Sequence, residues 1–198
     1  MFNLIRTYQL DIMLFLCGTC AIMTVLLVLT RFLPSGRKKI MIQMEAVAFF
    51  LLFFDRIAYI YAADPSRMGF IMVRVSNFFV FFLTSFVVIG FDIFLTDWML
   101  NEGRMTTVLK RLRFVAILAL CGMIMAVIAA FTDLYYYFDE INKYHRGQFF
   151  LVSYIIPVLC PLIISTVVIQ YRKIFSKRIL WISPRLSITC IMDYFRIN

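Results

Sequence analysis

The sequence predicts an all-α fold: a polytopic bundle of five transmembrane helices, with the N-terminus outside and the C-terminus in the cytoplasm. Of its 198 residues, 63% are hydrophobic and 16% are charged, whereas a soluble domain is about 45–50% apolar and 25% charged. The hydrophobic residues gather in runs long enough to cross a bilayer, which takes about 20 residues. Lysine and arginine gather in alternate loops, a pattern typical of cytoplasmic loops in membrane proteins.

The first two spans are expected at about residues 12–33 and 40–62. The first run is longer than the apolar core of a cleaved signal peptide and is followed by basic residues, so we interpret it as a retained helix. Pro34-Ser35-Gly36 predicts the turn that joins the two spans. A second turn follows at Asp64-Pro65-Ser66, where either Asp64 or Ser66 is expected to cap the next helix.

The third and fourth spans are expected at about residues 68–98 and 114–135. A basic loop separates them. The fourth span carries small residues at four-residue spacing, which favours close contact with another helix. These small residues are Gly122, Ala126 and Ala130.

The fifth span is expected at about residues 148–171, after an aromatic belt at 135–138 and a polar loop. It contains Pro157 and Pro161, one turn apart. Each proline removes a backbone hydrogen-bond donor from the helix. The spacing therefore predicts a kinked helix and a hinge at these two prolines.

The orientation follows from the count of lysine and arginine in the loops. Residues 31–39, 98–113 and 172–178 hold four each. The opposite set of loops holds four in total, at Arg6, Arg67, Lys143 and Arg146. The count of twelve against four predicts an N-terminus outside the membrane and a cytoplasmic segment after residue 171.

Several polar residues lie inside the predicted spans, where a charge costs at least about 2.5–3.5 kcal/mol near the bilayer centre. They are Asp55 and Arg56 in the second span, Arg74 and Asn77 in the third, and Asp133 near the outer end of the fourth. One interpretation is a set of structural ion pairs that fix helix register. The other is a polar, outward-facing pocket that binds a ligand.

Depth along the helices favours one ion pair in particular. Asp55 and Arg74 each lie roughly 10–13 Å from the turn that joins the second and third spans. The sequence therefore predicts contact between them in the outer third of the membrane. Arg56 points about 100° away from Asp55 around the helix, and Asp133 is its candidate partner.

Composition and motifs exclude several classes of function. The net charge of +9 comes from basic residues beside the apolar runs, which indicates membrane orientation rather than nucleic-acid binding. The sequence contains no metal-ligand cluster, phosphate loop or G-x-S-x-G motif. We therefore expect no enzymatic activity, no cofactor and no metal. The expected partners are membrane lipids, a second copy of the chain and a small or lipophilic ligand.

The stretch FDRIAYIYAADPSRMGFIMVRVSNFFVFFLT, residues 54–84, resembles the second and third helices of a multi-pass sensor region found in bacterial cyclic di-GMP signalling proteins. The first 18 residues are similar too, and the resemblance extends over about residues 1–178. In that family such a region precedes a cytoplasmic GGDEF or EAL output domain. The resemblance implies that this chain is a signal-input region, a sensor or transducer.

Two features depart from that family. Its sensor regions usually have seven or eight helices, and five are expected here, with no output domain. Residues 179–198 are interrupted by proline and charges and are expected to form a short cytoplasmic or interfacial tail. A truncated or frameshifted reading frame would explain both features. The alternative function is a small transporter or channel subunit whose buried charges line a path.

Overall fold

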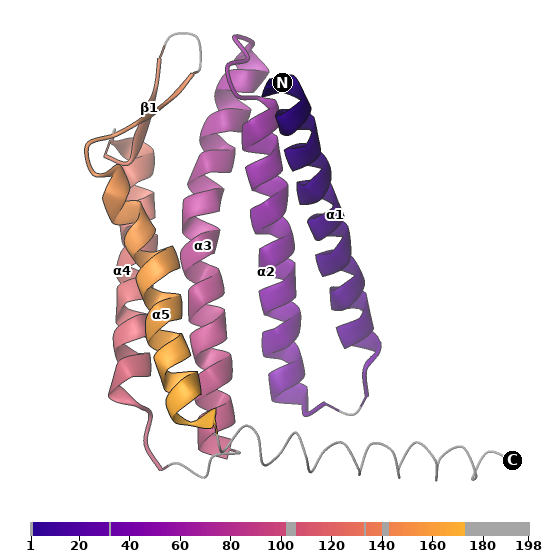
Figure 1. Cartoon of the computed structure of the whole chain (residues 1–198), viewed down its shortest axis with the longest axis vertical. Helices are drawn as coiled ribbons and strands as arrows, with labels where there is room; N and C mark the ends of the chain where they lie inside the picture. The colour runs from indigo at the N-terminus through magenta and orange to yellow at the C-terminus, as the bar shows by residue number, and fades with distance from the viewer. Residues whose placement is uncertain (1, 32, 102–105, 133, 140–142, 173–198) are drawn as a thin grey trace, which may run out of the picture.

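The computed structural model consists mainly of long helices that run alternately up and down (Figure 1). Its described part contains five α-helices and one two-stranded sheet. The described residues are 2–31, 33–101, 106–132, 134–139 and 143–172. The elements are α1 (Phe2–Leu29), α2 (Ser35–Ile60), α3 (Arg67–Asn101), α4 (Lys110–Phe131), β1 (Tyr136–Phe138), β2 (Tyr144–Arg146), the 3-10 helix η1 (Phe150–Tyr154) and α5 (Ile155–Gln170).

Four helical segments of the described chain are long and apolar enough to cross a membrane. They are Tyr8–Leu29, Arg67–Asn101, Lys110–Phe131 and Phe150–Gln170. Helix α2 has 26 residues, but Glu45, Asp55 and Arg56 reduce its apolar character. It lies between α1 and α3 and packs against both (Figure 1).

The helix ends follow local chain chemistry. Helix α1 ends at Leu29, before the predicted limit of 33, and Pro34 precedes the first residue of α2. Of the two expected caps for α3, Ser66 is the one used: its Oγ accepts a hydrogen bond from the Gly69 backbone N–H at 2.9 Å. Asp64 supports this cap by accepting hydrogen bonds from the Ser66 N–H and hydroxyl.

The expectation of an all-α chain is wrong after α4. The helix ends at Phe131 rather than at 135, because Thr132 takes an extended backbone conformation. An antiparallel hairpin follows, in which Tyr137 of β1 pairs with His145 of β2. Aromatic residues favour strands when they pack against neighbouring surfaces, and Tyr135 and Tyr136 pack against the ring of Phe81 on α3.

The segment 148–171 is also not one continuous helix. It begins as η1 and becomes α-helical at Ile155. Pro157 is the third residue of α5, where the missing N–H is tolerated, and Pro161 lies inside the helix. The irregular part of this span therefore lies before Pro157.

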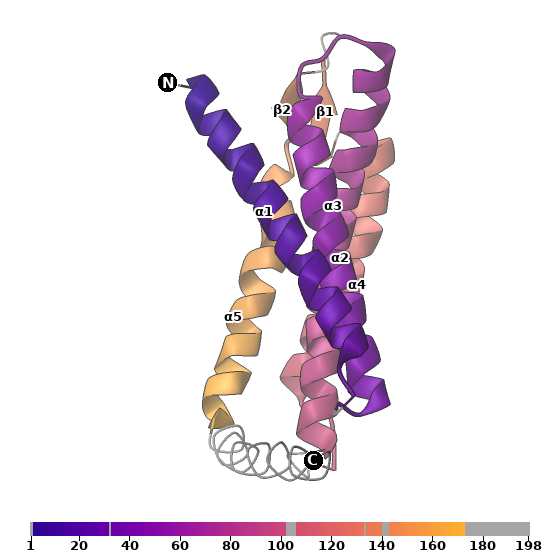
Figure 2. The same ribbon diagram turned by 90° about the vertical axis from the view of Figure 1, so that its right-hand side faces the viewer.

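The described core lies among α3, α4 and α5. The face of small residues on α4 is confirmed at Gly122 and Ala126, which are buried, whereas Ala130 is exposed and Ala129 is buried in its place. Helix α1 crosses the other helices obliquely (Figure 2) and packs against α2. Many of its apolar side chains are exposed, as expected for a helix that faces lipid.

Candidate functional site

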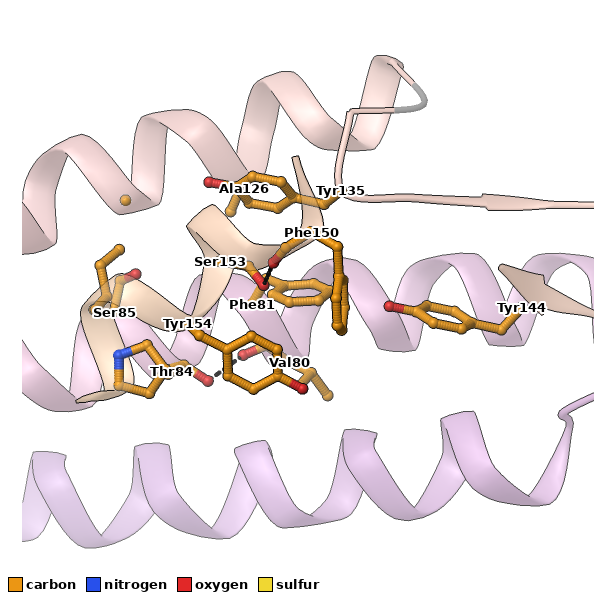
Figure 3. A pocket seen from close by; sticks show the side chains of 13 residues that line it. Val80, Phe81, Thr84, Ser85, Ala126, Tyr135, Tyr144, Phe150, Ser153 and Tyr154 are labelled. Atoms are coloured by element: carbon orange, nitrogen blue, oxygen red, sulfur yellow. Dashed lines mark hydrogen bonds between the residues drawn. The ribbon is translucent and has the colours of Figure 1, made fainter. Parts of the chain in front are cut away.

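A cavity of about 270 Å³ lies among α3, α4, η1 and the start of α5, directly below the hairpin. Figure 3 shows that side chains from all of these elements surround it. Its walls are mostly apolar and aromatic. The lining residues are Val80, Phe81, Thr84, Ser85, Gly122, Ala126, Tyr135, Tyr144, Phe150, Ser153, Tyr154, Ile156 and Pro157.

The inner wall of the cavity is made of small residues. Gly122 and Ala126 of α4 line the cavity, and Ile156 of α5 packs so closely against Gly122 that a Cβ atom there would collide with it. The hydroxyl of Thr84 donates to the Val80 carbonyl at 2.7 Å, and that of Ser153 donates to the Phe150 carbonyl at 2.6 Å. Because these two donors are already engaged with backbone, the wall presents a largely apolar surface.

The hairpin is held over the cavity by aromatic contacts. Phe81 of α3 lies 5.5 Å from Tyr136 and 5.7 Å from Tyr135, measured between ring centroids. Tyr136 stacks on Tyr144 at 5.8 Å, and Tyr144 meets the edge of Phe150 at 6.4 Å. Such pairs contribute about 0.5–1.5 kcal/mol each beyond burial, so the hairpin forms a fixed roof.

The tyrosines of the roof stay neutral at physiological pH. Burial raises the pKa of Tyr136 to about 12, and the nearby positive charge of Arg74 opposes the shift. Burial raises the pKa of Tyr144 to about 12 as well, and Tyr136 and Tyr154 add to it. Burial also raises the pKa of Tyr135. Neutral phenols can donate a hydrogen bond to a ligand.

A second, more polar compartment of about 210 Å³ lies around Arg74, on the α4 side of the hairpin. The guanidinium carbon of Arg74 lies 3.4 Å from the Phe70 ring centroid and 4.8 Å from that of Phe138. Its Nη1 also donates to the Phe70 carbonyl at 3.1 Å. Cation–π contacts contribute about 0.5–2 kcal/mol, so Arg74 joins α3 to the hairpin.

The predicted pair of Asp55 with Arg74 is wrong. Within the described residues Asp55 makes no hydrogen bond or ion pair. Helices α2 and α3 meet instead through stacked Phe54 and Phe79, at 4.4 Å. Phe79 lies five residues after Arg74, about 140° around the helix, whereas Phe81 lies seven residues after it, about 20° away. Equal depth does not bring Asp55 and Arg74 together, because Arg74 lies on the same face of α3 as Phe81, and this face meets the hairpin.

The other predicted site residues lie in different places. The Nε of Arg56 is buried without a hydrogen-bond partner among the described residues, and Asn77 donates to the Val73 carbonyl of its own helix at 2.7 Å. Neither lines the two compartments. Asp133 lies outside the described residues. Pro157 lines the cavity.

The sequence reasoning missed the residues of the roof. The sequence predicts a membrane-interface belt for Tyr135 and Tyr136 and a polar loop for Tyr144. The signal that could have found them is the run of four consecutive aromatic residues over 135–138, a residue type that also favours a short strand. The residues that line the cavity come from separate segments of the chain, so no local sequence motif indicates it.

Asp92 of α3 is a further buried polar residue. It is 5% exposed, and its Oδ1 has no hydrogen-bond partner among the described residues. It lies between Val88 and Leu95, which belong to the apolar core. Across the described residues, no three His, Cys, Asp or Glu side chains come close enough together to hold a metal ion.

No known protein family, curated protein or solved structure matches this chain.

Proposed function

We propose that this chain is the signal-input region of a bacterial inner-membrane protein, and that a small, largely apolar ligand enters the cavity below the hairpin. The observation that carries the proposal is the cavity itself. It is concave, mostly apolar and equipped with a few phenol groups, as ligand sites in proteins usually are.

We also propose that all five helices cross the membrane. The 26 residues of α2 correspond to about 39 Å, more than the hydrocarbon thickness of about 30 Å. Its neighbours α1 and α3 qualify as spans by composition. Packing between them allows the charges of α2 to face protein rather than lipid.

The charge distribution supports an N-terminus outside and a C-terminus in the cytoplasm. The α1–α2 turn, the start of α4 and the end of α5 lie at one end of the bundle (Figure 1). Most of the basic residues in the described loops and helix ends lie there, which is typical of a cytoplasmic side. They are Arg31, Arg37, Lys38, Lys39, Lys110, Arg111, Arg113 and Arg172. The hairpin and its cavity then lie near the outer surface.

The cavity wall offers a route from ligand to cytoplasm. Ile156 and Pro157, at the start of α5, line it, and α5 ends at the basic end of the bundle (Figure 1). A ligand that favours one position of η1 and α5 would shift the population of helix arrangements. The prolines would act as the hinge. The resemblance of residues 54–84 favours signalling over transport, with cyclic di-GMP metabolism as the proposed output.

Filling the cavity should abolish ligand binding. Val80 lines the cavity, so Val80→Phe should occupy the space that a ring-sized ligand needs. Fluorine NMR of 4-fluorophenol, a probe with one ring and one hydroxyl, measures binding to the detergent-purified protein as line broadening. We expect broadening with the original protein and at least about tenfold weaker binding with Val80→Phe.

Val75→Phe is the matched control, since Val75 lies on the same helix and is 41% exposed. It should leave the broadening unchanged. Equal broadening with both variants, or none with the original protein, would contradict a ligand site in this cavity.

A further inference from the structure

A second concave feature lies at the opposite, basic end of the bundle. It is a groove of about 500 Å³ between the first turns of α4 and the last turns of α5. It is open to the surroundings of the bundle, unlike the cavity below the hairpin. The lining residues are Lys110, Arg111, Phe114, Leu162, Ile163 and Thr166.

The end of the groove nearest the basic loops is positively charged. Lys110 and Arg111 are exposed at the beginning of α4. Arg111 reaches across to α5, where its Nη1 donates to Gln170 Oε1 at 3.0 Å. Lys110 makes no ion pair with any described residue, and the first turn of α4 contains no acidic residue. An anionic group here would meet two cations, and no carboxylate is among the described residues that line the groove.

The rest of the groove is apolar and faces outward. Phe114 is 53% exposed and Leu162 is 59% exposed, and Ile163 also lines the groove. Phe114 lies one turn beyond Lys110 on α4, so the apolar wall continues directly from the charged end. The groove is therefore positively charged at one end and apolar along the rest of its length, in one continuous surface.

We infer that this groove binds an anionic phospholipid. The phosphate would lie against Lys110 and Arg111, and an acyl chain would lie along Phe114 and Leu162. Basic pockets between transmembrane helices at the cytoplasmic side bind anionic head groups in this manner. A second copy of the chain would cover the apolar wall but would bring its own basic residues to the charged end, so charge complementarity favours the lipid.

The test measures lipid binding to the full chain by native mass spectrometry. Phosphatidylglycerol should bind more tightly than phosphatidylcholine of the same chain length. The variant Lys110→Gln/Arg111→Gln should weaken phosphatidylglycerol binding by about tenfold or more, since each basic residue contributes measurably to anionic lipid binding. Leu162→Asn, which keeps both charges, should weaken the same complex.

The matched control is Arg31→Gln/Lys39→Gln, which removes two exposed cations from the same end of the bundle. It should leave phosphatidylglycerol binding within about twofold of the original value. Equal loss of phosphatidylglycerol binding in both double variants would indicate general electrostatic attraction to the basic end of the bundle. That result would overturn the groove as the binding site. Equal binding of the two lipids, displacement by inorganic phosphate, or a dimer that excludes lipid from the groove would each overturn the proposal as well. None of these outcomes depends on ligand binding below the hairpin.

Discussion

Replacing Gly122 by leucine should lower the free energy of unfolding of the bundle by about 1–3 kcal/mol, the usual effect of overpacking a core. A Cβ atom at Gly122 would collide with the side chain of Ile156 on α5 and would lie 2.9 Å from Ser85 Oγ on α3. Three helices therefore meet at this glycine. Thermal unfolding of the purified protein in detergent measures the effect as a lower melting temperature.

The chain supplies a matched control for this change. A Cβ atom at Gly18 of α1 would meet nothing within 4 Å. Gly18→Leu should therefore leave stability unchanged or raise it by up to about 1 kcal/mol, because leucine favours helix more than glycine does. Equal melting temperatures for the two variants would show that α3, α4 and α5 do not pack around Gly122.

Replacing Asp92 by leucine should raise the free energy of unfolding, the opposite of the effect expected for Gly122→Leu. Asp92 is 5% exposed, and its Oδ1 has no partner among the described residues. Leaving such a group unsatisfied costs about 1–3 kcal/mol, and leucine matches the surrounding core. We therefore expect Asp92→Leu to raise the melting temperature.

Asp97→Leu, on the same helix as Asp92, should lower the melting temperature. The Oδ2 of Asp97 accepts a hydrogen bond from Arg37 Nε at 2.8 Å, which joins α3 to α2. Both side chains are partly exposed, so the loss should not exceed about 1 kcal/mol. Two shifts of the same sign would contradict the different environments assigned to the two carboxylates.

The helices were predictable because each long apolar run has one stable form in a bilayer, and proline or an Asp-Pro-Ser turn marks several ends. The end of α4 was not predicted at the right residue, because Thr132 and Asp133 interrupt the apolar run for only two residues before Leu134 and four aromatic residues continue it. The hairpin depends on the ring of Phe81, which lies more than 50 residues earlier in the chain.

The candidate site was predictable only in part. Sequence reasoning found Arg74 and Pro157, which line the two compartments. It paired Arg74 with the wrong helix, because depth along a helix follows from residue counting whereas rotation about the axis depends on how the neighbours pack. The cavity itself arises where small residues of α4 face aromatic residues of α3 and η1, and a single segment does not reveal it.

The central claim is that α2 crosses the membrane as one of five spans, with the hairpin end of the bundle outside. Single cysteines are introduced, in a variant without the native cysteines, at Ser35, the first residue of α2, and at Ser66, in the turn between α2 and α3. A membrane-impermeant maleimide applied to intact cells should label the cysteine at 66 at once, and the cysteine at 35 only after permeabilisation. Labelling of both positions from the same side would contradict the five-span arrangement.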